Sequence, residues 1–158
     1  MTVPNDLLPL VTQYRAGLEA EIALLERLAA LAERERHVTA SGSLTALAEI
    51  TDARDGVMAN LVAIEAQLAP VRRLLVISLD RLGGSQEFEE LAALHKNAST
   101  LASAIMSTDQ HSMASLREAE LARRFAQESL DQGESTLAAY RRVVNPPLAN
   151  ATLVNRRG

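Results

Sequence analysis

Three histidines are the side chains of this sequence best suited to chemistry: His37, His95 and His111. Glu33 and His37 share a helix face, but a di-iron bundle needs Glu-x-x-His pairs on facing helices, and the sequence holds none. An exposed His95 could accept a phosphoryl group on a helical bundle. Phosphotransfer domains carry Lys-Gly three and four residues after that histidine, where this chain has Ala98 and Ser99. We therefore expect no metal site, and phosphotransfer at His95 is kept only as an alternative.

Other catalytic motifs are missing from the sequence. There is no cysteine, which excludes disulfides, thiol catalysis and zinc–thiolate sites. Gly83-Gly84 has no Walker lysine near it, and no Gly-x-Ser-x-Gly elbow occurs. Carboxylates are abundant, but acid–base catalysis needs an enclosed site that shifts their pKa values, which a narrow helical bundle rarely builds. We expect a protein that is not an enzyme and needs no cofactor.

Composition and charge limit the partners. The 158 residues include 16 basic and 20 acidic side chains, for a net charge of −4, and such an acidic domain is not typical of a nucleic-acid binder. No apolar run approaches the ~18–20 residues of a membrane helix, so we expect no membrane insertion. The N-terminal segment has no basic region followed by an apolar one, which predicts no signal peptide and a cytoplasmic protein.

Apolar residues recur at steps of three and four along most of the chain, which predicts long amphipathic helices. The first helix is expected over about 6–37 with Asn5 or Asp6 as its cap, the second over 43–82 with Ser43 as its cap, and the third over 85–143. The first helix should bury one face, made of Leu7, Val11, Tyr14, Leu18, Ile22, Leu25, Leu28 and Ala32. Residues 145–158 contain Pro146-Pro147, lack periodicity and are expected to form a flexible tail.

These helices predict an all-α fold, an elongated antiparallel bundle of three, possibly four, long helices with coiled-coil-like packing, in one domain over 1–144. Pro70 falls inside the second helix, where the apolar pattern continues in register, so we expect a kink rather than a break. The polar stretch 107–112 either lies within one long third helix or divides it in two, and the pattern favours continuity.

The predicted third helix is longer than the other two. Its surplus length would expose Phe125, Leu130, Leu137 and Tyr140, and an exposed apolar helix surface usually binds a partner. The alternative is that the third helix breaks and folds back, so that the same side chains fill a four-helix core. We take Phe125, Leu130 and Leu137 as candidate client-binding residues on the first of these readings.

Several short runs resemble one protein family. Leu24-Leu25-Glu26-Arg27-Leu28 with Glu33 and Glu35, Leu47-Ala48-Glu49-Ile50 with Arg54, and Ile64-Glu65 with Arg72 are similar to its leucine–glutamate pairs followed by a basic residue. Leu94, Asn97 and Leu101 are similar to its asparagine-and-leucine pattern, and Tyr140 follows Thr136-Leu137 near the C-terminus. The chain thereby resembles the FlgN-type flagellar export chaperones over most of its length. It departs from them where Arg141-Arg142 follow Tyr140 in place of a glycine-containing run.

The resemblance implies a cytoplasmic secretion chaperone. Such proteins bind amphipathic C-terminal helices of hook–filament junction proteins and deliver them to the flagellar export gate, which Tyr140 would contact. The runner-up reading is a generic helical adaptor or a homodimeric coiled-coil protein, in which the third helix pairs with its own copy.

Overall fold

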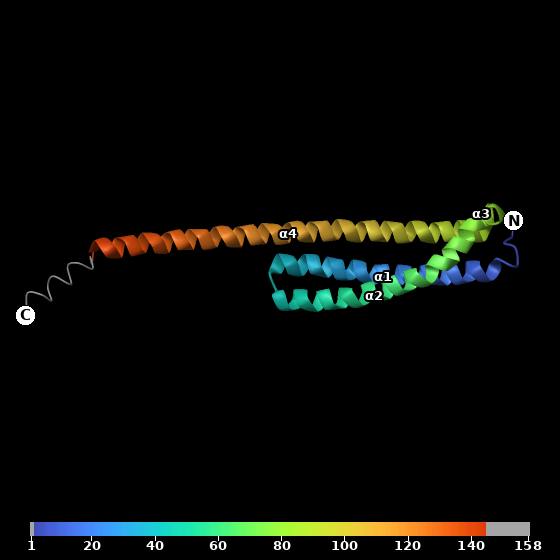
Figure 1. Cartoon of the computed structure of the whole chain (residues 1–158), viewed down its shortest axis with the longest axis horizontal. Helices are drawn as coiled ribbons and strands as arrows, with labels where there is room; N and C mark the ends of the chain where they lie inside the picture. Colours follow the sequence, from blue (N-terminus) through green and yellow to red (C-terminus); the bar gives the residue numbers. More distant parts are fainter. Residues whose placement is uncertain (1, 145–158) are drawn as a thin grey trace, which may run out of the picture. The chain divides into compact units, whose positions relative to one another are not determined.

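A computed structural model describes residues 2–144 of the chain, which form helices and no strand. The helices are α1 (Leu8–Ser41), α2 (Leu44–Ile77), α3 (Leu79–Leu82) and α4 (Gln86–Val144) (Figure 1). The chain divides into two compact units, Met1–Ser115 and Leu116–Gly158. The first unit is a bundle of α1, α2, α3 and the beginning of α4, which confirms the all-α helical-bundle prediction. The predicted tail, 145–158, lies outside the described residues.

α1 buries the face that the sequence pattern predicts: all eight of its expected residues from Leu7 to Ala32 are buried. Its ends differ from the expected ones. The helix begins at Leu8, and the carboxylate of Asp6 does not cap it but accepts two hydrogen bonds from Arg81, at 2.8 and 2.9 Å. It continues to Ser41, past the expected end at His37, and stops where Gly42 takes the left-handed φ of 75°.

α2 begins as expected, with the Ser43 hydroxyl accepting from the Ala46 amide. Pro70 lies inside α2 and does not break it, and Figure 1 shows the helix changing direction along its second half. The expected single helix to residue 82 is corrected, because α2 ends at Ile77 and Ser78 separates it from the short α3. This break leaves Ile77 80% exposed and buries Leu82 to 1% exposure, so it redirects the chain into the core.

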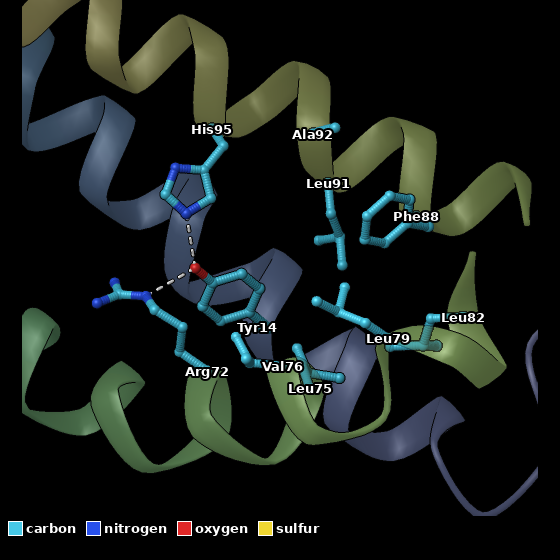
Figure 2. A pocket seen from close by; sticks show the side chains of 10 residues that line it. All are labelled: Tyr14, Arg72, Leu75, Val76, Leu79, Leu82, Phe88, Leu91, Ala92 and His95. Carbon is cyan, nitrogen blue, oxygen red and sulfur yellow. Dashed lines mark hydrogen bonds between the residues drawn. The ribbon is translucent and has the colours of Figure 1, made fainter. Parts of the chain in front are cut away.

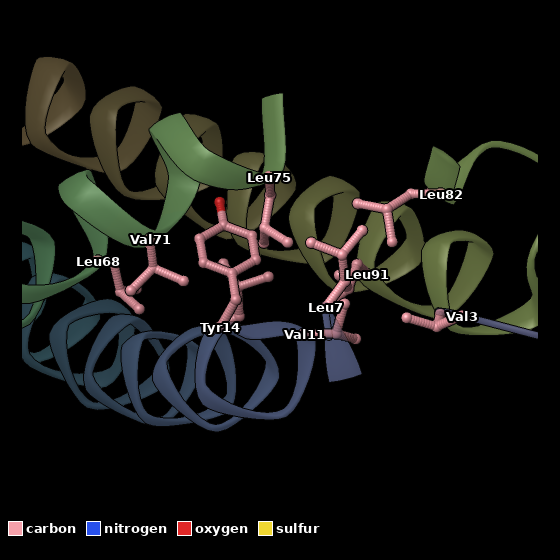
Figure 3. Close-up of a cluster of buried hydrophobic side chains, with 10 residues drawn as sticks. Val3, Leu7, Val11, Tyr14, Leu68, Val71, Leu75, Leu82 and Leu91 are labelled. Atoms are coloured by element: carbon pink, nitrogen blue, oxygen red, sulfur yellow. The ribbon is translucent and has the colours of Figure 1, made fainter. Parts of the chain in front are cut away.

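The core of the first unit consists of two clusters, of which Figure 3 shows the one that surrounds Tyr14. α4 contributes Leu91, Ala98, Ile105 and Ser112, which recur every seven residues as in coiled-coil packing. Ser112 takes the fourth buried position of this series, whereas the adjacent and more apolar Met113 is 53% exposed. α4 is continuous through 107–112, as expected.

Two helical glycines offer a matched test of this packing. A Cβ on Gly17 would collide with the buried Leu68 side chain, whereas a Cβ on Gly56 meets nothing within 4 Å. Replacing a mid-helix glycine with alanine stabilises by about 0.5–1 kcal/mol where space allows, so Gly56→Ala should raise the melting temperature. Gly17→Ala should be less stable than Gly56→Ala by about 1–3 kcal/mol because of overpacking. Equal melting temperatures for the two variants would contradict the close approach of α1 to α2.

Candidate functional site

A chain of polar side chains crosses the first unit from helix to helix. Arg72 on α2 donates from Nε to the Tyr14 hydroxyl of α1 at 3.0 Å, and that hydroxyl lies 2.9 Å from Nε2 of His95 on α4. Arg72 Nε can only donate, so the Tyr14 oxygen accepts there and its own proton is available to His95. Figure 2 shows the three side chains meeting at this point. The Arg72 guanidinium also lies 5.8 Å from the centre of the Tyr14 ring.

This row of hydrogen-bonded side chains ends in a pair of carboxyl groups. Arg72 donates to both oxygens of Glu65 at 2.9 and 3.1 Å, and Glu65 is hydrogen-bonded to Glu21 of α1. Burial and the neighbouring Glu65 raise the pKa of Glu21 to about 7, and Arg72 lowers the pKa of Glu65. Glu21 is therefore the protonated partner and Glu65 the carboxylate.

This pair predicts a pH-dependent stability. The folded-state pKa of Glu21 lies above its ordinary value of 4.5, so the unfolded chain loses this proton first and the unfolding free energy falls as pH rises from about 4.5 to 7. Glu21→Gln cannot ionise and should be more stable than the parent at pH 8 by about 1 kcal/mol, a value reduced for the partial exposure of this side chain. The two proteins should differ less at pH 5.

The measurement is denaturant unfolding of both proteins at pH 5 and pH 8. Glu26→Gln is the control, since Glu26 is an exposed residue of the same helix and the change in charge is the same. If the difference in stability between the parent and Glu21→Gln were the same at pH 5 and at pH 8, the pKa of Glu21 would not be raised in the folded protein.

Beside Tyr14 the surface is hollowed. We call this the Tyr14 hollow; it has a volume of about 390 Å³ and opens to solvent. Tyr14, Arg72 and His95 lie at one end, and the rest of the wall is apolar and comes from α2, α3 and α4: Leu75, Val76, Leu79, Leu82, Phe88, Leu91 and Ala92 (Figure 2).

A second charged cluster ties α1, α2 and α4 together. Arg54 of α2 donates to both oxygens of Asp109 on α4, at 2.7 and 2.8 Å, and forms an ion pair with Glu35 of α1. The Arg54 side chain is 17% exposed. The Asp109 hydrogen bond is the main reason that the pKa of Arg54 lies above its ordinary value. Arg54 therefore joins α2 to both α1 and α4.

The second unit places its large apolar side chains in solvent. We call Leu116, Leu121, Phe125, Leu130, Leu137 and Tyr140 the C-terminal apolar surface; their exposed fractions range from 41% at Leu116 to 69% at Leu130. The predicted client-binding residues are all on it, as is Tyr140. The alternative in which the third helix breaks and buries these residues in a four-helix core is wrong, because α4 runs unbroken to Val144 and Phe125, Leu130, Leu137 and Tyr140 are each more than half exposed.

Five of these side chains form two groups around the helix, and Tyr140 lies between the groups, about 60° from Leu137 and about 60° from Phe125. Leu116, Leu130 and Leu137 are separated by multiples of seven residues, and Leu121 and Phe125 by four, so each group shares one face. Leu130 follows Phe125 by five positions, which is about 140° around an α-helix. The C-terminal apolar surface is thus wider than the contact strip of a two-stranded coiled coil.

No protein-family model, curated protein or solved structure matches this chain. Among residues 2–144, no helix has both the length and the apolar character needed to cross a membrane. Within the same residues, no three His, Asp or Glu side chains are grouped so that they could hold a metal ion.

The histidines singled out from the sequence lie in different places. His37 is exposed near the end of α1, and His111 is exposed and bonded through Nδ1 to the Ser107 carbonyl. His95 is the histidine that belongs to a wider network. Sequence reasoning missed that network and the Tyr14 hollow, although a tyrosine on a buried face was a usable signal, because a buried Tyr hydroxyl usually has a hydrogen-bond partner.

Proposed function

We propose that this protein binds amphipathic helices of a partner protein on its C-terminal apolar surface and acts as a chaperone for that partner. The observation that carries the proposal is the exposure of every described side chain from Leu121 to Arg141, large apolar ones included. A helix usually gains most of its stability by packing an apolar face against another element. A partner helix would supply that packing.

The distribution of side chains favours an apolar and helical partner. Four arginines and five carboxylates are interspersed between Leu116 and Arg141, so the segment has little net charge with which to attract a nucleic acid or a charged surface. Glu120 is already paired with Arg123 and Arg124. The two apolar groups, about 140° apart, suit two partner helices, one against each group.

The resemblance to the FlgN-type chaperones supports a narrower version. In it the clients are hook–filament junction proteins, whose C-terminal helices would self-associate if left free in the cytoplasm. Phe125, Leu130 and Leu137 contact the client, and Tyr140 contacts the flagellar export gate, which competes for the complex. The mechanism uses no nucleotide, metal or other cofactor.

Self-association is the second candidate, because the seven-residue spacing of Leu116, Leu130 and Leu137 is also the spacing of a homodimeric coiled coil. Light scattering distinguishes the two. A chaperone is monomeric until a client is added, whereas a structural coiled coil is dimeric by itself.

The test is a pull-down with the full-length protein and with a version that ends at Ala126. We expect the full-length protein alone to recover one or two long-helical exported proteins, whose purified C-terminal helical segments then bind it in a defined ratio. Recovery of no such protein, together with a tight dimer in light scattering, would replace the chaperone proposal with the structural one.

A further inference from the structure

The Tyr14 hollow lies in the first unit and is independent of the C-terminal apolar surface. Its volume of about 390 Å³ falls in the range of small-molecule sites, and apolar walls with a few convergent polar groups at one end are the usual form of such sites. It is not filled by any described side chain. Val76 and Leu79 at its rim remain 57% and 41% exposed.

The shape of the hollow sets the size of its ligand. On α4 its wall runs from Phe88 to His95, two turns of helix and about 10 Å, which is about the length of an extended chain of eight carbon atoms. The intervening wall is aliphatic, with Leu75 and Leu79 opposite Leu91 (Figure 2). A narrow alkyl chain would bury its methylene groups there.

The polar end sets the charge of the ligand. Arg72 is the cation at this end, and it is already neutralised by the two hydrogen bonds that it donates to Glu65. An anionic head group would therefore find no unpaired positive charge, and a cationic head group would find no unpaired carboxylate, because Glu65 already accepts from Arg72 through both of its oxygens. An uncharged hydroxyl can instead donate a hydrogen bond to the Tyr14 oxygen, which keeps one free lone pair beside its bonds to Arg72 and His95.

We propose that the Tyr14 hollow binds an uncharged amphiphile, with an alkyl chain of about eight carbons along the leucine wall and a hydroxyl head group at Tyr14 and His95. Buried methylene groups supply most of the affinity. The Tyr14–His95 end selects the head group.

The test uses 1-octanol, octanoate and octylammonium as probes of the full-length protein. Binding is followed by chemical shifts of the Tyr14 ring and by contacts between its protons and those of the probe in solution NMR. We expect saturable binding of 1-octanol at roughly 1 mM, the weak affinity that so small a ligand allows, and at least tenfold weaker binding of octanoate and octylammonium. Equal binding of octanoate would overturn the assignment of an uncharged head group.

A pair of variants locates the binding. Ala92 lies in the wall of the hollow and is exposed, so Ala92→Phe should fill the space without disturbing the core and should weaken 1-octanol binding at least tenfold. Ala104→Phe makes the same change at an exposed position of α4 outside the hollow and should bind like the parent. Unchanged binding by Ala92→Phe would overturn the proposal. Binding of a leucine-rich helical peptide in the hollow without binding of 1-octanol would also overturn the proposal, because that result would assign the hollow to a protein partner.

Discussion

Phe125→Asp combined with Leu130→Asp should abolish binding of the client helix. The two side chains are 67% and 69% exposed and belong to the two separate groups of the C-terminal apolar surface. A carboxylate in each would have to be desolvated against an apolar partner without a counter-charge, which is far costlier than losing the contact alone. We expect affinity to fall at least 100-fold, measured by titration of the purified client segment, while the helix content seen by circular dichroism changes little.

Ser135→Asp combined with Ala138→Asp is the matched control. It adds the same two charges to the same exposed stretch of α4, but both positions lie about 80° or more around the helix from Phe125 and from Leu130, and no large apolar side chain is removed. The control should bind the client within a few-fold of the parent. Full binding by the Phe125/Leu130 variant would refute the assignment of the site, and equal loss in both variants would attribute the effect to charge.

The helical architecture could be predicted from the sequence because periodicity reports burial directly. The face of α1 from Leu7 to Ala32 was predicted residue by residue, since every apolar side chain on it has the same role. Pro70 was correctly placed inside a helix, because the apolar pattern keeps its register on both sides of it. The exposure of Phe125 also followed from the sequence, as one of two alternatives based on helix length.

The features that were missed depend on contacts between helices. Nothing local marks Ser78 as a break; the position of Leu82 in the core, set by α1 and α4, makes the break favourable. Asp109 contributes to the low helix propensity of 107–112 and makes this segment look solvated. In the structure its carboxylate instead accepts two hydrogen bonds from the Arg54 guanidinium of α2. The Tyr14 network likewise joins residues 58 and 81 positions apart, which no periodicity reveals.

Arg54→Met should destabilise the first unit by about 2 kcal/mol. Methionine retains the length and the apolar stem of the side chain but removes the cation, so Glu35 and Asp109 would be left as two partly buried carboxylates without a partner. Removing one member of a fully buried pair costs about 3–5 kcal/mol, and we reduce that value because Asp109 is 35% exposed. Denaturant unfolding measures the loss. Arg73→Met, at an exposed position of α2, should change stability by less than about 0.5 kcal/mol.

A triple variant distinguishes the contribution of the ion pairs to stability from the contribution of the packed arginine stem. Adding Glu35→Gln and Asp109→Asn to Arg54→Met removes the unpaired charges, and it should recover more than half of the lost stability. Hydrogen exchange gives an independent readout, because the amides of 107–112 should exchange faster in Arg54→Met once α4 is no longer held to α2 there. If Arg54→Met unfolded at the same denaturant concentration as Arg73→Met, with the 107–112 amides equally protected, Arg54 would have no role in joining the helices. The continuity of α4 through its polar stretch would then depend on Ile105 and Ser112 alone.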